Sequence, residues 1–212
     1  MNKNKDNEKS TVLRDVSING NMLKYASEEL RDDKDVVLTA VTQAGMALQY
    51  ASSQMQNDKE VVLAAIEQNF DSLQYASDRL KDNKEIVLIA VNNYGFSLQN
   101  ASQRLINDKE VVLTAIKNYP ESLSFASDEL KNNKDIVLTV IRTHPDSFQF
   151  ASEFLKNEME CLSLYLNSLS LKQSEYPLFY KECEFKFKLL KEQAWLNDNI
   201  AHNNKNYKPR KF

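Results

Sequence analysis

The sequence predicts an all-α solenoid of about six helix-turn-helix repeats of 25 residues, closed by a longer C-terminal capping helix. Three observations support this prediction. An Ala-Ser dipeptide recurs every 25 residues, an aromatic residue precedes five of its six copies, and all three glycines occupy one fixed position of the repeat. The dipeptides begin at Ala26, Ala51, Ala76, Ala101, Ala126 and Ala151.

Each repeat is expected to begin with a short helix that is apolar on nearly every side, such as Val61–Ile66. Such a helix is suited to burial between neighbouring repeats. Asn57 followed three residues later by Glu60 resembles a capping box, which would start this helix. The Asx position recurs at Asn7, Asp32, Asn57, Asp82, Asn107, Asn132 and Asn157.

A corner is expected where glycine, proline or, once, phenylalanine stands. The corner residues are Gly20, Gly45, Phe70, Gly95, Pro120 and Pro145. Glycine can end the first helix in the left-handed conformation, and proline can begin the second. Leu73, Ala76 and Leu80 have the spacing of one helical face, which predicts a second helix of about ten residues. Helices this short require stacking to persist in water.

The same pattern predicts the domain organisation. Residues 1–7 form a polar N-terminal segment, residues 8–158 form six tandem repeats, residues 159–202 form a helical cap, and residues 203–212 form a basic tail expected to be disordered. The N-terminus contains no secretory signal, and no apolar run is long enough to span a membrane. We therefore expect a cytoplasmic protein, or one delivered into a host cytosol if it is an effector.

The repeat phrases resemble a known family. The segments Asn57–Ile66 and Leu73–Leu80 are similar to the tandem helical repeats catalogued as domain of unknown function 4116, and the resemblance covers about residues 8–158. It implies tandem helical repeats of a kind frequent in proteins of host-associated microbes. It implies no catalytic residues, because the family has none assigned.

The sequence offers little for catalysis, and we expect no enzyme, cofactor or metal site. Its two histidines, His144 and His202, and its two cysteines, Cys161 and Cys183, form no metal-ligand or nucleophile–base pattern. Most acidic residues lie at expected helix starts, where capping explains them.

Departures from the repeat consensus cluster around the fourth repeat and indicate a protein-binding patch. The alternative is that these side chains fill a gap left where Asn100 replaces the usual aromatic residue. The candidate partner-binding residues are Ile89, Tyr94, Phe96, Asn100, Ile106 and Tyr119.

The C-terminal helix carries a second apolar stripe beyond the one that capping requires. This second candidate surface would bind a partner or a second copy of the chain, giving a homodimer. Its residues are Leu178, Phe185, Leu189, Trp195 and Leu196.

One lysine per repeat could form an anion-binding edge that contacts nucleic acid. Acidic neighbours nearly cancel its charge, and the net charge is −3, so nucleic acid is disfavoured as a partner. The edge comprises Lys34, Lys59, Lys84, Lys109 and Lys134, continuing from Lys9.

The favoured function is a non-enzymatic scaffold that binds a protein of unknown identity. A second hypothesis is a phage- or pathogen-encoded inhibitor or effector that blocks a host nuclease or signalling complex. The third is a nucleic-acid-binding solenoid that uses the lysine edge.

Overall fold

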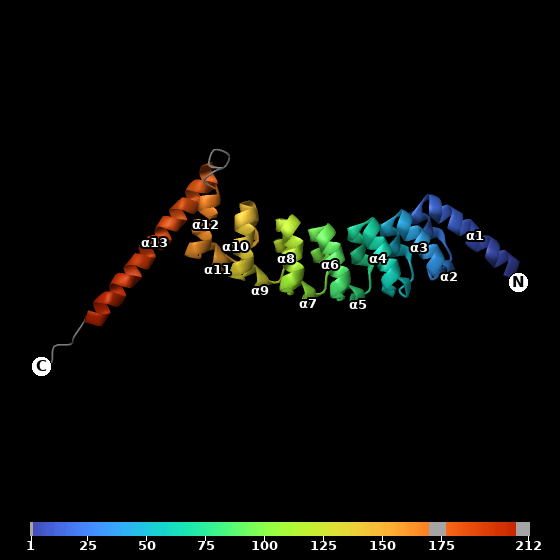
Figure 1. The fold of residues 1–212 in the computed structure, drawn as a ribbon, viewed down its shortest axis with the longest axis horizontal. Coiled ribbons are helices and arrows are strands. Elements are labelled where there is room, and N and C mark those ends of the chain that lie inside the picture. Colours follow the sequence, from blue (N-terminus) through green and yellow to red (C-terminus); the bar gives the residue numbers. More distant parts are fainter. Residues whose placement is uncertain (1, 170–176, 207–212) are drawn as a thin grey trace. The chain divides into compact units, whose positions relative to one another are not determined.

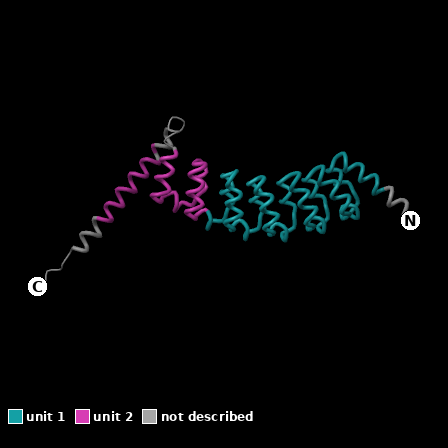
Figure 2. The backbone as a smooth tube through the Cα atoms, in the orientation of Figure 1, with its two compact units in different colours: residues 1–130 teal, residues 131–212 magenta. Residues whose placement is uncertain are grey.

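Helices form all the regular secondary structure in the part of the chain that the computed structural model describes. That part comprises residues 2–169 and 177–206 of the backbone and, for side chains, residues 8–168, 181 and 183–198. Because these residues include no β-strand and form tandem helical repeats, the all-α solenoid fold class is confirmed (Figure 1). The chain divides into two compact units, residues 1–130 and residues 131–212 (Figure 2).

Each repeat after the first contains three helical segments, namely a ten-residue α-helix, a six-residue 3₁₀-helix and a short helical turn, and in the first repeat the longer α1 takes the place of the ten-residue helix. The ten-residue helices are α3 (Lys34–Gln43), α4 (Lys59–Gln68), α6 (Lys84–Asn93), α8 (Lys109–Asn118) and α10 (Lys134–Thr143). The 3₁₀-helices are η1 (Gly20–Tyr25), η2 (Gly45–Tyr50), η4 (Phe70–Tyr75), η5 (Gly95–Asn100), η6 (Pro120–Phe125) and η7 (Pro145–Phe150). The short turns are α2 (Glu28–Arg31), η3 (Met55–Asn57), α5 (Asp78–Lys81), α7 (Gln103–Ile106), α9 (Asp128–Lys131) and α11 (Glu153–Lys156).

Three further helices lie at the two ends of the chain. They are α1 (Asn2–Ile18), α12 (Met159–Leu169) and α13 (Pro177–Asn206). Within the first unit, α1, α3, α4, α6 and α8 form one layer, and the 3₁₀-helices η1 to η6 form a second layer against it (Figure 1). Within the second unit, α12 packs between α10 and α13. Helix α13 continues into the segment expected to be a disordered tail, and residues 207–212 lie outside the described residues.

The core consists of apolar side chains that recur at the same repeat positions. In α4 the side chains of Val61, Val62, Ala65 and Ile66 are fully buried, and the equivalent residues of the other long helices are buried with them. Leu73 from η4 is also fully buried. The four buried positions of α4 share one face of the helix, while Leu63 and Ala64 on the other side are half-buried, so the apolar pattern is wider than the buried face.

The expected second helix of each repeat is not continuous, and that part of the prediction is wrong. Ala76, expected inside it, has φ −66° and ψ 155°, which is extended backbone between η4 and α5. The reason lies in the preceding repeat. The Ser77 backbone N–H donates a hydrogen bond to the carbonyl of Gln56 at 2.9 Å instead of to its own helix. The same bond joins four other pairs: Ser52 to Arg31, Ser102 to Lys81, Ser127 to Ile106 and Ser152 to Lys131.

The serine side chain makes a second connection between repeats. The Ser77 hydroxyl donates to Oδ1 of Asn57 at 2.6 Å and also accepts from the backbone N–H of Leu80 in its own repeat. One side chain therefore caps its own short helix and binds the preceding repeat. This double role accounts for the recurrence of the serine every 25 residues.

The capping residue also lies one position later than the sequence pattern indicated. The cap of α4 is Asp58, whose carboxylate accepts from the backbone N–H groups of Glu60 and Val61. Asn57, which the pattern selected, instead accepts the hydroxyl of Ser77 from the next repeat. The two neighbouring Asx residues thus divide the two tasks between them.

The glycines serve close packing rather than a left-handed turn. No glycine has a positive φ among the described residues, contrary to the sequence-based expectation. A Cβ atom added to Gly45 would lie 2.4 Å from the carbonyl oxygen of Ala65, on the long helix of the next repeat. Phe70 occupies the same repeat position, and there the adjacent long helices α4 and α6 pack less closely than α3 and α4 or α6 and α8. At the glycine corners the missing Cβ therefore permits the close approach of the next long helix, whereas at Pro145 the helices α10 and α12 pack closely around a proline.

Candidate protein-interaction site

Five aromatic rings from three successive repeats form one contiguous cluster in the first unit. We call this set the aromatic cluster: Phe70, Tyr94, Phe96, Tyr119 and Phe125. Each residue is half-buried, so part of each packs within the repeats and part contacts solvent. Aromatic pairs at such distances add to the stabilisation that burial provides.

Tyr94 and Tyr119 form the centre of the cluster. Both stand directly after a ten-residue helix, at the C-caps of α6 and α8, with extended or near-extended backbone. Because the residues have the same repeat position, stacking brings their ring centroids to 5.3 Å in an edge-to-face arrangement. Phe70 extends the row on one side, with its centroid 6.1 Å from that of Tyr94.

Phe96 connects this row to the 3₁₀-helix layer. Its ring centroid lies 5.3 Å from that of Tyr94, 5.9 Å from that of Tyr119 and 5.9 Å from that of Phe125. Adjacent repeats carry Asp71 and Glu121 at the position of Phe96. The fourth repeat therefore carries the apolar ring of Phe96 at a position where the two flanking repeats carry carboxylates.

The structure brings together three of the six residues that the sequence indicated. Ile89 is half-buried on α6, Asn100 ends η5 and Ile106 ends α7, so these three lie outside the ring contacts that define the cluster. Sequence reasoning missed Phe70 and Phe125 as members. Their signals were a phenylalanine at a corner otherwise held by glycine or proline, and the aromatic residue that precedes Ala126.

The lysine edge is occupied by ion pairs between repeats. Lys34 Nζ lies 2.9 Å from Asp58 and 2.8 Å from Glu60, both in the next repeat. Three other lysines contact acidic residues at the same offsets: Lys9 with Asp33 and Asp35, Lys84 with Asp108 and Glu110, and Lys134 with Glu158 and Glu160. Lys59 pairs with Glu85 at 2.6 Å. These ammonium groups already bind carboxylates, so the geometry does not favour the nucleic-acid hypothesis.

These contacts shift the pKa values of both partners. Hydrogen bonds to Glu60 and Asp58 raise the pKa of Lys34 above its ordinary value. Burial alone would raise the pKa of Asp58, but hydrogen bonds from Lys34 and from the backbone amides of Val61 and Glu60 hold it below its ordinary value. The same pattern recurs at Asp33 and Asp108.

We predict that acid and strong base each lower the stability of the repeats through this edge. The depressed carboxylates contribute stability that is present above their ordinary pKa of 3.8 and lost as the pH falls through their folded values. The raised lysines contribute stability that is present below 10.5 and lost as the pH rises through their folded values. The thermal midpoint should be constant between these two pH limits and fall outside them. Lys84→Met should make the fall less steep on the acidic side and on the basic side. A midpoint unchanged in acid would contradict the prediction.

A family comparison identifies the repeats. The family described as a domain of unknown function (DUF4116) matches residues 9–56, 58–106 and 108–156, which together make up more than half of the chain. The chain belongs to this family. Each match spans two of the 25-residue units, and the predicted resemblance is confirmed. No curated protein and no solved structure matches the chain.

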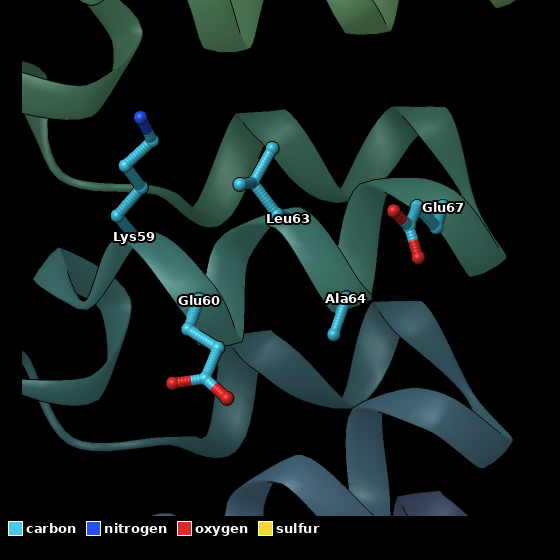
Figure 3. A pocket seen from close by; sticks show the side chains of 5 residues that line it. All are labelled: Lys59, Glu60, Leu63, Ala64 and Glu67. Carbon is cyan, nitrogen blue, oxygen red and sulfur yellow. The ribbon is translucent and has the colours of Figure 1, made fainter.

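A hollow on the surface of the DUF4116 repeats lies along α4 (Figure 3). It is lined by Lys59, Glu60, Leu63, Ala64 and Glu67, and all five come from this one helix. Side chains on a single exposed helix face do not converge on a point, so the hollow lacks the shape of a ligand site. Ala64 of this hollow corresponds to Ile89 in the next repeat, so Ile89 lies on the equivalent face of α6.

The histidines and cysteines considered for catalysis lie in different parts of the fold. No group of three or more His, Cys, Asp or Glu side chains that could hold a metal ion occurs among them. Cys161 is buried. Its burial, and to a lesser extent its hydrogen bond with Glu158, raises the pKa of its thiol to about 11, which suppresses the reactive thiolate. His144 is the C-cap of α10, and the side chain of His202 lies outside the described residues. Among the described helices, none has the length and apolarity to cross a membrane.

The second candidate surface lies on α13 and is exposed to solvent. Phe185 is 68% exposed, Trp195 66%, Leu196 51% and Leu189 45%. The side chain of Leu178 lies outside the described residues. Large apolar side chains with this exposure on one helix are typical of an interaction surface.

Proposed function

We propose that this protein is a non-enzymatic scaffold whose aromatic cluster binds a segment of another protein. The observation that carries the proposal is the convergence of five half-buried rings from three successive repeats. Tyrosine and phenylalanine supply large contact areas with few rotatable bonds, and aromatic residues dominate the binding energy of many interfaces. The repeat framework holds these rings in place before binding, which reduces the entropy lost on association.

The residues around the cluster suggest the chemistry of the partner. Asp71 and Glu121 occupy the flanking repeats at the position of Phe96, and both are at least partly exposed. A complementary segment would insert an apolar or aromatic side chain against the rings and place basic side chains beside the two carboxylates. The Tyr94 and Tyr119 hydroxyls offer hydrogen bonds to its backbone.

Reverting two residues toward the repeat consensus tests this proposal. Tyr94→Asn and Phe96→Asp install the residues found one repeat earlier, Asn69 and Asp71, so the fold is expected to tolerate them. The immobilised wild type should retain a protein from a lysate of the native cells. We predict that the double variant retains at least about tenfold less of this protein, as expected for hot-spot residues.

The matched control is Tyr25→Ala, which removes a ring that is 75% exposed in the first repeat. This control should retain the partner at the wild-type level, and circular dichroism should show equal helicity in all three proteins. Equal retention by the double variant and the wild type would refute the aromatic cluster as the binding site.

A further inference from the structure

Helix α13 has two apolar faces, and one of them packs against the second unit among the described residues. Cys183 lines a cavity of about 210 Å³ together with Leu162 and Tyr165 of α12. Phe187 and Leu190 share the face of Cys183 at helical spacing, and all three are half-buried. This face attaches α13 to the second unit.

The opposite face carries Phe185, Leu189 and Leu196, spaced at i, i+4 and i+11, with Trp195 at its margin. All eight side chains of residues 191–198 are exposed. An apolar stripe of this kind on a solvated helix is the geometry of a helix-pairing surface.

Two opposite charges on this stripe indicate what covers it. Lys188 and Glu192 lie one helical turn apart on the same face as Phe185 and Leu189. Lys188 also contacts Glu184 on its own helix at 3.4 Å. A purely apolar partner would bury Glu192 against apolar side chains and desolvate the Lys188–Glu184 pair, which is costly.

We propose that α13 pairs with α13 of a second copy of this chain, in the antiparallel orientation, to form a twofold-symmetric dimer. With the axis midway between Lys188 and Glu192, each lysine faces the glutamate of the other copy. Phe185 then faces Trp195 and Leu196 of the other copy, and the two Leu189 side chains meet beside the axis. A parallel pair would instead oppose lysine to lysine and glutamate to glutamate, which is unfavourable. The interface is isologous, as closed dimers require.

A charge-swap series on the full-length chain tests the pairing. Lys188→Glu alone opposes two glutamates at each contact, and Glu192→Lys alone opposes two lysines. We expect the wild type to sediment as a concentration-dependent dimer and each single variant to weaken dimerisation by about tenfold or more, because two symmetric contacts become repulsive. The double variant Lys188→Glu with Glu192→Lys restores complementarity and should return the dissociation constant to near the wild-type value.

The control is Lys117→Glu, which makes the same charge change on the exposed surface of α8 and should leave the dimer intact. Circular dichroism should confirm equal helicity across the series. A wild type that remains monomeric at every concentration would overturn the proposal. Two further outcomes would also overturn it: single variants that dimerise like the wild type, and a double variant no better than the singles. Because none of these substitutions touches the aromatic cluster, the result is independent of the proposed function.

Discussion

Gly95→Ala should loosen the junction between α6 and α8 and lower the free energy of unfolding by about 1–3 kcal/mol, the usual cost of overpacking. An added Cβ would lie 2.5 Å from the carbonyl oxygen of Ala115, 2.6 Å from the Ser122 hydroxyl and 2.8 Å from Cβ of Tyr119. Two of these atoms belong to backbone or Cβ positions that cannot rotate away. The neighbouring repeat must therefore shift.

The spacing at Phe70 indicates what form the shift takes. There a bulky corner residue accompanies looser packing of α4 against α6, and the repeats remain folded. Gly95→Ala should reproduce that looser spacing one repeat later. Because the added Cβ would displace Tyr119, the ring of Tyr119 should also move away from the ring of Tyr94.

Chemical denaturation of the variant and of Gln99→Ala, an exposed position in the same 3₁₀-helix, provides the measurement and its control. Tyrosine fluorescence and amide exchange at α8 report the separation of the repeats. If the glycine variant unfolds at the same denaturant concentration as the glutamine variant, the missing Cβ at Gly95 does not control the packing of α6 against α8.

The repeat architecture was predictable because the same residue types recur at a constant spacing along the sequence. Ala76-Ser77 and its copies occur every 25 residues, and the four buried positions of α4 recur in each repeat. The interruption at the dipeptide was not predictable from one repeat. Leu73, Ala76 and Leu80 have helical spacing whether or not the helix is continuous, and the acceptor of the Ser77 N–H belongs to another repeat.

The same dependence on neighbours explains the errors at the site and at the caps. Asn57 and Asp58 are both good capping residues, and the structure shows that Asp58 caps α4 while Asn57 accepts the hydroxyl of Ser77 from the next repeat. Tyr94, Phe96 and Tyr119 departed from the consensus and were found for that reason. Phe125 matched its consensus position, and it joins the aromatic cluster through its contact with Phe96, which departs from the consensus.

Removing residues 176–212 should destabilise the second unit by several kcal/mol while leaving the first unit folded. Leu162 and Tyr165 are only 2% and 5% exposed, and both line the cavity that α13 shares with α12. Fully exposing one large apolar side chain costs about 1.5–3 kcal/mol, so partial exposure of these two residues is expected to cost a few kcal/mol. Phe148, whose ring centroid lies 4.8 Å from that of Tyr165, should lose part of its support.

In a repeat protein, stability is approximately a sum of local and nearest-neighbour terms, so the loss should remain near the truncated end. Amide exchange should accelerate in α12 and η7 and remain slow in α3 and α4. The matched control is Gln193→Ala, an exposed position of α13 that lies outside the proposed pairing stripe and keeps Cys183 and Leu190 in place. That control should keep the wild-type thermal midpoint. Equal midpoints for the truncated and full-length chains would instead mean that α13 does not cap the repeats, and that both of its faces are available for binding.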